Sequence, residues 1–426
     1  MKAEILTIGD ELLRGEIVDT NKSFLSDRLL RFDVETRFHS SVCDDPDDMA
    51  DAFRRAATRA DVVLVSGGLG PTRDDITLDV LARTFGRGLV RHEPSLAAIR
   101  AFFERLGREM SPSNGKQALL PEGAEVLPNP VGTAPGCMLE VGRAVFFCLP
   151  GVPRELMRML DDEVLPRLAE RIRPAGGGVL RATLLRSFGM GESTLEDELK
   201  DLAREEGVSL GFRTAFPDNY LRPVVRAATE AEASARLERV CEAIEKRLGP
   251  LIYGRDDETL ELVLGRLLAA RGLTLGVAES CTGGLLAERI SAVPGASRYF
   301  RGGVVAYADQ AKRDLLGVGA ALLDAHGAVS APVARAMAEG ARARLGADLA
   351  VSTTGISGPD GGSAAKPVGL VFVGFADSRG SEAHEFLFPF DRTRHRLVTS
   401  QVALDWVRRA LLGESRVAPR WLRGRA

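Results

Sequence analysis

Short apolar runs alternate with amphipathic segments through the first part of the chain, and this alternation limits the folds open to it. Strand-like runs and helix-like segments follow one another at residues 3–9, 21–32, 34–42, 47–59, 61–68 and 73–86. Apolar strands joined by helices form parallel sheets that are covered by helices on both faces. The alternation therefore predicts an α/β protein whose N-terminal part is a doubly wound, mostly parallel sheet.

Two glycine- and proline-rich breaks, at residues 171–178 and 248–258, divide the chain into three segments. The middle segment combines strand-like residues 180–189 and 222–229 with a charged helix at 230–248. This is typical of a small α+β module, and we expect it to act as a spacer. The last segment alternates strands and helices again, which indicates a second α/β domain. The expected domains are residues 1–172, 179–252 and 258–413.

Charge and cysteine content exclude several classes of function. The net charge of −3 offers no basic surface for nucleic acid, so no nucleic-acid partner is expected. The five cysteines form no C-x-x-C pair, which argues against a disulfide framework and a zinc site. Any metal is therefore expected on carboxylates. Because no apolar run approaches about 18 residues, we expect no membrane partner. We also expect a cytoplasmic homodimer.

Glycine-rich motifs end the predicted strands of the first segment. They are GDELLRG (9–15), SGGLGPTRDD (66–75), NPVGTAPGC (129–137) and LPGVPREL (149–156). Open parallel sheets bind ligands at the carboxyl ends of their strands, and backbone N–H groups in such loops can hold an anion. The candidate substrate-binding residues are Ser66, Gly67, Gly68, Gly70, Asn129 and Gly132.

Aspartates accompany two of these motifs. Asp10 ends the first strand, and Asp74 and Asp75 stand at the expected entry of the helix at 73–86. Together they could hold a divalent ion that bridges phosphate oxygens. A plainer interpretation stays open, because aspartate in a first helical turn is common and contributes about 0.3–1 kcal/mol through the helix dipole. Glycine-rich turns also occur without ligands.

Two hydroxyl-rich glycine loops follow apolar strands in the last segment. They are AESCTGG (278–284) and STTGISGPDGG (352–362), and both can face one pocket at the strand ends. The further motifs are PGASRYF (294–300), VVAYADQAK (304–312) and KPVG (366–369). The expected pocket residues are Ser280, Thr282, Gly283, Gly284, Gly355 and Gly358.

Three residues of this segment are candidate nucleophiles: Cys281, Ser280 and Ser297. A nucleophilic cysteine needs a base, most often histidine, and the nearest histidine along the chain is His326. The fold could still bring a histidine close, so the cysteine remains a candidate at this stage.

A serine–lysine pair is the alternative to a histidine base. Lys312 is the only lysine between Lys246 and Lys366, and it closes the VVAYADQAK motif. The plainer interpretation makes Lys312 an exposed helix lysine, Tyr307 a core aromatic residue and Ser297 a helix cap. Spacing alone favours that plainer interpretation.

The four motifs of the first segment resemble the molybdopterin-binding domain at the front of the CinA (competence/damage-inducible protein A) family. The architecture of that family matches essentially the whole chain: this domain, a small KH-like domain and a C-terminal amidase domain. The resemblance implies that the first domain is a pyrophosphatase acting on ADP-ribose with a divalent cation, either Mg²⁺, Mn²⁺ or Co²⁺.

The motifs of the last segment look like the nicotinamide-nucleotide amidase domain, which converts nicotinamide mononucleotide to nicotinate mononucleotide and ammonia without a cofactor. The resemblance implies that Ser297 is the nucleophile, Lys312 its base and Tyr307 a proton-relay partner, and it places Ser280 and Thr282 in the pocket. The sequence departs from the family pattern at one point. Phe390 stands where the family usually has glycine before an Asp-Arg pair.

The two resemblances together imply a bifunctional enzyme, and three other functions are its alternatives. A non-catalytic competence or DNA-damage binding protein is disfavoured by the net charge of −3. A molybdopterin-nucleotide binding or processing protein leaves the last segment unexplained. RNA binding by the middle module is disfavoured because the module has no G-x-x-G clamp, and Gly189 and Gly191 have the wrong spacing.

Overall fold

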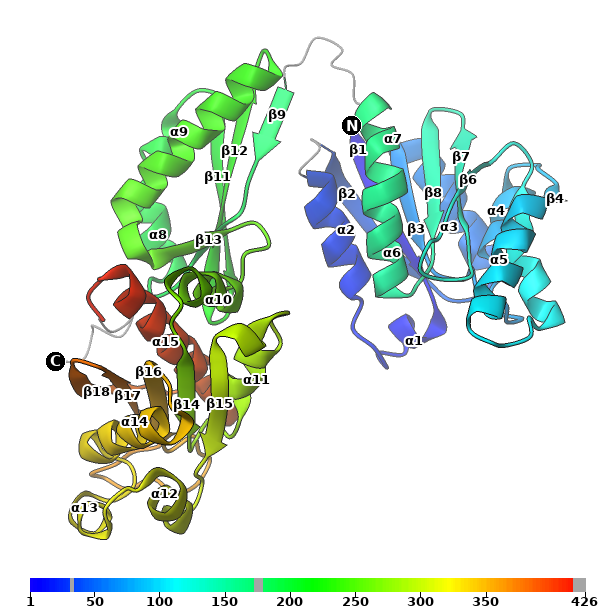
Figure 1. Cartoon of the computed structure of the whole chain (residues 1–426). Helices are drawn as coiled ribbons and strands as arrows, with labels where there is room; N and C mark the ends of the chain where they lie inside the picture. Colours follow the sequence, from blue (N-terminus) through cyan, green and yellow to red (C-terminus); the bar gives the residue numbers. More distant parts are fainter. Residues whose placement is uncertain (31–33, 172–178, 417–426) are drawn as a thin grey trace. The chain divides into compact units, whose positions relative to one another are not determined.

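A computed structural model describes residues 1–30, 34–171 and 179–416. The chain divides into two compact units, drawn in Figure 1. Unit 1 comprises Met1–Ala182 and Arg226–Ala233, and unit 2 comprises Thr183–Val225 and Ser234–Ala426. Residues 172–178 of the expected first linker lie outside the described residues.

Unit 1 is built on a six-stranded sheet of order β2-β1-β3-β8-β7-β6. Strands β2, β1, β3 and β8 are parallel, β7 pairs antiparallel with β8, and β6 pairs antiparallel with β7. The strands are β1 (Lys2–Ile8), β2 (Glu35–Val42), β3 (Val62–Ser66), β6 (Glu125–Leu127), β7 (Gly136–Val141) and β8 (Ala144–Leu149). The predicted doubly wound, mostly parallel sheet is confirmed.

Helices cover both faces of this sheet. Helices α3 and α4 pack on one face, and α2, α6 and α7 pack on the other. The helices are α1 (Asp10–Leu13), α2 (Thr20–Leu30), α3 (Pro46–Arg59), α4 (Thr77–Thr84), α5 (Glu93–Arg105), α6 (Pro153–Met159) and α7 (Leu165–Arg171). Two short strands, β4 (Leu89–Arg91) and β5 (Leu119–Pro121), pair separately. Because α4 begins at Thr77, Asp74 and Asp75 precede the helix instead of occupying its first turn.

The middle module is antiparallel, with strand order β11-β12-β10-β13 and β9 pairing with β12. The strands are β9 (Val179–Ala182), β10 (Leu185–Ser187), β11 (Val208–Ala215), β12 (Asp218–Ala227) and β13 (Ile252–Arg255). Helices α8 (Glu192–Leu199) and α9 (Glu230–Leu248) complete it. The predicted α+β class is confirmed, although the strand expected at 180–189 is divided into β9 and β10.

The last part of unit 2 is a five-stranded sheet of order β15-β14-β16-β17-β18. Strands β14, β15 and β16 are parallel, and β17 and β18 are antiparallel. The strands are β14 (Leu275–Glu279), β15 (Phe300–Val305), β16 (Leu349–Gly355), β17 (Leu370–Asp377) and β18 (Gly380–Leu387).

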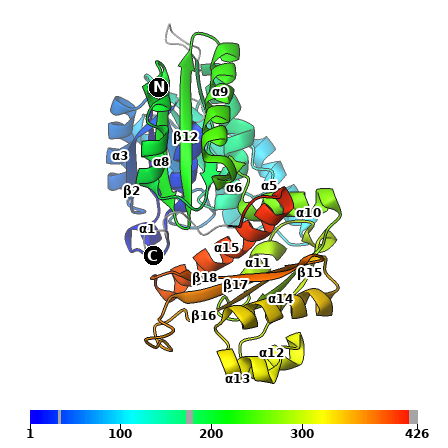
Figure 2. The same ribbon diagram turned by 90° about the vertical axis from the view of Figure 1, so that its left-hand side faces the viewer.

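Helices also cover both faces of the second sheet. Helix α14 lies on one face, and α10, α11 and α15 form a core with the other, as Figures 1 and 2 show. The helices are α10 (Leu260–Arg271), α11 (Leu285–Ser291), α12 (Asp309–Leu316), α13 (Ala320–His326), α14 (Ala331–Leu345) and α15 (Arg392–Leu412).

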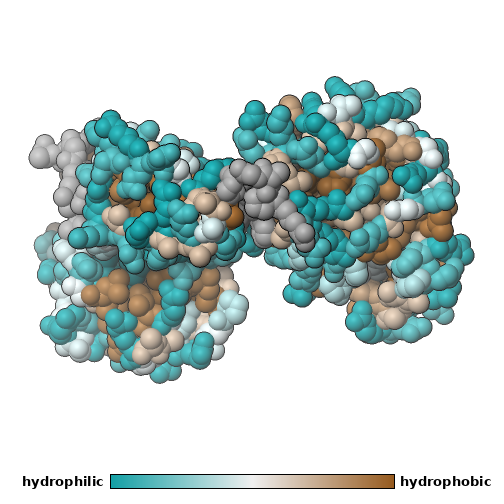
Figure 3. Space-filling model, turned by 90° about the horizontal axis from the view of Figure 1, so that it is seen from above, coloured by the Kyte–Doolittle hydropathy of each residue, from teal (hydrophilic) through white to brown (hydrophobic). Residues whose placement is uncertain are grey.

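Hydrophilic residues dominate the face of the molecule drawn in Figure 3, with apolar residues between them. Large apolar side chains that stay accessible include Val18, Val152, Val305 and Tyr307. None of the helices in residues 1–30, 34–171 and 179–416 combines the length and the apolar character that a membrane span requires.

Candidate active sites at the strand ends

The last residue of β14 fixes the loop that follows it. The carboxylate of Glu279 is fully buried and accepts hydrogen bonds from the backbone N–H groups of Gly284, Leu286 and Ala287, at 3.0, 3.0 and 2.8 Å. These N–H groups open α11, so the carboxylate caps the helix. Gly284 has φ 96°, in the left-handed region that favours glycine. Glu279 was not among the residues predicted, although an acid shortly before a helix start is a known capping signal.

The hydroxyl residues of this loop attach it to β16 and α15. The hydroxyl of Thr282 is fully buried and lies 2.7 Å from the hydroxyl of Thr353, and the N–H of Ser280 donates to the Thr353 carbonyl at 2.9 Å. The guanidinium of Arg396 donates twice to the Thr282 carbonyl, at 3.0 and 2.7 Å. The structure therefore brings Ser280, Thr282 and the neighbouring strand end together.

Cys281 lies in the apolar core beneath the loop. Burial raises the pKa of its thiol to about 12; the charge of Glu279 adds to this effect, and a hydrogen bond with Thr353 opposes it. A thiol with this pKa is protonated at neutral pH, whereas the thiolate is the nucleophilic form. The environment of Cys281 thus argues against it as the nucleophile.

Lys312 is buried and Tyr307 is exposed, which is the reverse of the plainer interpretation. Lys312 is 1% exposed; its Nζ donates to the backbone oxygen of Tyr307 at 3.0 Å and pairs with Asp309 at 3.4 Å. Tyr307 is 59% exposed, and its hydroxyl accepts a hydrogen bond from Nη2 of Arg392 at 3.2 Å. Lys312 thus contacts the backbone of Tyr307, whereas the phenol hydroxyl of Tyr307 contacts Arg392.

Ser297 lies at the other end of β15. It is exposed, within a short 3-10 helix (Ala296–Arg298) between α11 and β15, and it does not cap a helix. Strands β14 and β15 are parallel, so Ser297 precedes the start of β15 while Tyr307 and Lys312 follow its end, beside residues 280–284. A single copy of the chain does not bring Ser297 and Lys312 together.

The start of α15 contributes further polar side chains to the strand ends. Nη1 of Arg392 donates to the backbone oxygen of Gly358 at 3.1 Å. The buried imidazole of His395 lies 2.9 Å from the Ser357 hydroxyl and 3.2 Å from the Gly369 carbonyl. Burial lowers the pKa of His395; the charge of Arg392 adds to this effect, and the bond to Gly369 opposes it. Helix α15 thus holds the loop after β16 in place.

Phe390, the departure from the family pattern, contacts the middle module. Its ring packs edge-on against Phe216, with centroids 4.9 Å apart. Phe216 belongs to the turn between β11 and β12, and Asp218, the first residue of β12, accepts a hydrogen bond from Nε2 of Gln401 on α15 at 2.5 Å. Burial raises the pKa of Asp218 to about 7.

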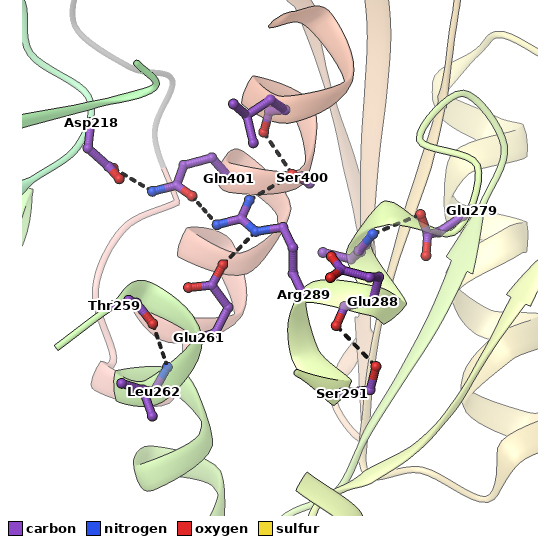
Figure 4. A network of polar contacts seen from close by, with 12 residues as sticks. Asp218, Thr259, Glu261, Leu262, Glu279, Glu288, Arg289, Ser291, Ser400 and Gln401 are labelled. Carbon is purple, nitrogen blue, oxygen red and sulfur yellow. Dashed lines mark hydrogen bonds and ion pairs between the residues drawn. The ribbon is translucent and has the colours of Figure 1, made fainter. Parts of the chain in front are cut away.

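A polar network continues from Asp218 to α11, as Figure 4 shows. Arg289 of α11 donates to Glu261 at 2.5 Å and to the side-chain oxygen of Gln401 at 2.5 Å. Gln401 in turn donates to Asp218. Because α11 directly follows residues 280–284, the network connects the start of β12 with the candidate site.

In unit 1 the loop after β3 meets the ends of β1 and β8. Gly67 has φ 113°, and a Cβ there would lie 2.2 Å from the carbonyl oxygen of Ile8. Asn21 joins the loops: its Nδ2 donates to the Ser66 hydroxyl at 3.1 Å and to the Gly151 carbonyl at 2.8 Å. Asn21 was not predicted, because nothing in the sequence separates it from the other polar residues of its helix.

Carboxylates gather at the ends of β1 and β2. The N–H of Asp10 donates to the Asp44 carboxylate at 3.1 Å, and the N–H of Asp44 donates to the Asp10 carboxylate at 3.2 Å. Burial raises the pKa of Asp44, and the charges of Asp10, Glu11 and Asp74 raise it further. The structure therefore brings Asp10 and Asp44 together, and Asp44 was missed because no glycine motif marks it.

Asp75 has a different role from Asp74. Its carboxylate accepts hydrogen bonds from the N–H and the hydroxyl of Thr72, at 2.7 and 2.5 Å, and so fixes the turn before α4. Within the described parts of the chain, no three His, Cys, Asp or Glu side chains stand close enough to share a metal ion. Asp10 instead pairs with Arg14.

Several of the remaining predicted residues of unit 1 line two separate cavities. A cavity of about 470 Å³ between α5 and the loop after β6 is lined by His92, Phe102, Arg105, Asn129, Gly132 and Thr133, among others. A second, of about 200 Å³, is lined by Gly68, Gly70, Asp75, Lys116 and Gln117. The structure thus places Asn129 and Gly132 in one cavity and the SGGLG loop in another.

Known protein families match the whole arrangement. Residues 4–170 match the probable molybdopterin binding domain, residues 182–254 the damage-inducible protein CinA KH domain, and residues 257–411 the CinA C-terminal domain.

Curated relatives are similar over nearly the full length. The chain is 45% identical to the CinA-like protein of Geobacter metallireducens and 42% identical to that of Dictyoglomus thermophilum, in each case over 97% of this chain and 100% of the relative. A solved structure of the protein CinA with unknown function from Thermoplasma acidophilum is 36% identical and covers 39% of this chain and 97% of that chain, with a TM-score of 0.37.

Proposed function

Because the chain belongs to the CinA family, we propose that its C-terminal domain hydrolyses the carboxamide of nicotinamide mononucleotide to nicotinate mononucleotide and ammonia. The observation that carries this proposal is Lys312. It is 1% exposed, its Nζ lies 3.0 Å from the Tyr307 carbonyl, and it stands at the same strand ends as the hydroxyl-rich loop 280–284. A lysine in this setting has the position of a general base.

The reaction is an acyl transfer. The hydroxyl oxygen of Ser297 attacks the carboxamide carbon, and Lys312 acts as the base that takes the proton. The C–N bond breaks, the proton passes to the departing nitrogen, and ammonia leaves. Water then cleaves the ester between Ser297 and the nicotinoyl group, which restores the hydroxyl. Tyr307 relays the proton from beside Lys312.

Ser280 is the alternative nucleophile, because it lies at the same strand ends as Lys312. Its backbone is held by Thr353, and the residue is 9% exposed. Cationic side chains at these strand ends suit a nucleotide phosphate: Arg392 and Arg396 both reach the loops.

Ammonia release from nicotinamide mononucleotide tests the proposal on the full chain. Wild-type protein should produce ammonia and nicotinate mononucleotide, and Lys312→Met should reduce turnover by about 10³-fold or more, as expected for loss of a catalytic base. Lys246→Met, at an exposed position of α9, is the matched control. Wild-type activity in Lys312→Met would remove the basis of the assignment.

We also propose that the N-terminal domain hydrolyses the pyrophosphate of ADP-ribose with a divalent cation. The supporting observation is the pair of hydrogen bonds between Asp10 and Asp44, together with the pKa of Asp44, which burial raises and the charge of Asp74 raises further. Carboxylate oxygens suit a hard ion such as Mg²⁺, Mn²⁺ or Co²⁺, and Asp10 and Asp44 would supply two of its ligands. When bound, such an ion compensates the negative charge of the two phosphates. The cavity beside Phe102 and Asn129 suits the adenine base.

This second activity is tested by following AMP formation from ADP-ribose. Activity should require added Mg²⁺, Mn²⁺ or Co²⁺ and disappear with a chelator, while ammonia release stays unchanged. Equal loss of both activities on chelation would contradict two separate sites. Binding of a pterin nucleotide without hydrolysis of ADP-ribose would favour the alternative role in molybdenum-cofactor chemistry.

A further inference from the structure

Strand β15 is the edge of its sheet, and it separates two halves of the proposed amidase machinery. In the described chain it pairs with β14 on one side. Ser297 precedes its first residue, and Tyr307 and Lys312 follow its last. An exposed edge offers backbone N–H and C=O groups to another strand.

The length of β15 keeps the two halves apart in one copy. Its six residues, Phe300–Val305, span about 17 Å at about 3.3 Å per residue. Proton transfer from Ser297 to Lys312 requires their reacting atoms within about 3 Å. Both residues sit on elements fixed by β15 itself, so a side-chain rotation does not close this gap.

A two-fold axis across the edge strand removes the separation. When a strand pairs antiparallel with a second copy of itself, the start of each copy lies beside the end of the other. Pairing centred between Gly302 and Gly303 sets Ser297 of one copy opposite Ala308 of the other. Ala308 lies between Tyr307 and the helix that carries Lys312.

Charge along the edge is self-complementary for this pairing. Arg298 and Arg301 are exposed at the start of β15, and Asp309 and Asp314 are exposed beyond its end, with one exposed basic residue, Arg313, between them. The antiparallel arrangement brings the basic end of each copy to the acidic end of the other.

Apolar residues at the same edge are accessible as well. Val305 is 46% exposed and Tyr307 is 59% exposed, and Leu315 of α12 is 50% exposed. Contact with a second copy would bury apolar surface of this kind.

We propose that β15 pairs antiparallel with β15 of a second copy and that Ser297 of each copy completes the amidase site at Tyr307 and Lys312 of the other. This inference rests on the proposed deamidation, because that reaction assigns the serine and the lysine to one site. It makes the second copy part of the active site, beyond a role in assembly.

Complementation between two inactive variants tests the shared site. Ser297→Ala and Lys312→Met should each be inactive alone. After subunit exchange, a mixed dimer holds one site with both native residues. Random exchange makes half of the dimers mixed, so ammonia release should recover to about a quarter of the wild-type rate.

The controls separate exchange from chemistry. Native mass spectrometry of tagged chains confirms that mixed dimers form. A mixture of Ser297→Ala with the double variant Ser297→Ala/Lys312→Met should stay inactive. Mixed dimers of the two single variants without any recovery would overturn the proposal, as would full activity of the wild-type chain as a monomer.

A charge exchange tests the pairing without any activity. Arg298→Glu should raise the dimer dissociation constant about tenfold or more, because it places like charges together. Arg298→Glu/Asp309→Arg should restore it, as measured by analytical ultracentrifugation. A dimer dissociation constant that is the same in both variants and in the wild type would contradict pairing through β15. If the charge exchange behaves as expected but wild-type protein releases no ammonia, the deamidation proposal fails and the pairing stands.

Discussion

Arg396 of α15 donates two hydrogen bonds to the single carbonyl oxygen of Thr282, at 3.0 and 2.7 Å. The contact holds the candidate substrate loop against a long buried helix. Arg396→Ala should therefore raise KM for nicotinamide mononucleotide about tenfold, since loss of a charged hydrogen bond to a loop costs about 1.5–3 kcal/mol. Arg344→Ala, at an exposed position of α14, is the control. An unchanged KM in folded Arg396→Ala would show that the loop keeps its position without this contact.

Removal of the buried thiol should leave the amidase active. Burial raises the pKa of Cys281 to about 12, so the thiolate is scarce at neutral pH. Cys281→Ala should keep most of the ammonia release, whereas Ser297→Ala should lose nearly all of it. Steady-state rates of both variants, with Ser280→Ala beside them, identify the nucleophile. The assignment of Ser297 is falsified if Ser297→Ala turns over normally while Ser280→Ala or Cys281→Ala is inactive.

Asp44 should prove essential to the N-terminal activity alone. It is the carboxylate on which the charges of Asp10, Glu11 and Asp74 act, so its loss removes the centre of the proposed ion site. Asp44→Asn should abolish metal-dependent hydrolysis of ADP-ribose and leave ammonia release intact. Asp47→Asn, in the exposed first turn of α3, is the control. Retained hydrolysis of ADP-ribose by Asp44→Asn would show that the ion does not bind at Asp44.

Asp218 should make the stability of unit 2 depend on pH. Its pKa is raised from 3.8 to about 7 by burial, so the folded state holds this proton more tightly than the unfolded chain does. The stabilisation is fully present below about pH 4 and is lost as the pH rises through about 7. The upper bound on the loss is about 4 kcal/mol, since one pKa unit corresponds to about 1.4 kcal/mol.

Denaturant unfolding of wild type and Asp218→Asn at about pH 5 and pH 8 measures this effect. Asparagine keeps an oxygen acceptor for Gln401 but does not titrate, so the variant should lose less stability between the two pH values. Burial lowers the pKa of His395, which acts in the opposite sense, so only the difference between the two proteins isolates Asp218. If the free energy of unfolding changes equally with pH in both proteins, Asp218 is not the source of the pH dependence.

The fold class follows from sequence because apolar strands and amphipathic helices have different periods, and the parallel sheets of both units appear as expected. Helix boundaries were less predictable. The pattern at 73–86 predicts a longer helix than α4, because Asp74 and Asp75 are compatible with a helix start as well as with a turn.

Several features of the candidate sites depend on the tertiary structure and were not predictable from the sequence. Spacing favoured an exposed Lys312 and a buried Tyr307, and the structure has the opposite, because burial depends on α14 and the sheet instead of on local pattern. Asp44 comes from a segment without a motif and joins the site through strand order. The separation of Ser297 from Lys312 likewise depends on strand direction, which spacing along the chain does not encode.

The contact between Phe216 and Phe390 bears on how this domain can be exchanged between chains in evolution. A last domain beginning at Glu258 would lack Phe216, against which the Phe390 ring packs, and Asp218, which accepts a hydrogen bond from Nε2 of Gln401. The middle module is therefore more than a spacer for this chain. Recombination that moves the last domain without the turn would have to replace Phe390 as well. A glycine at this position would have no ring that needs Phe216 as a partner.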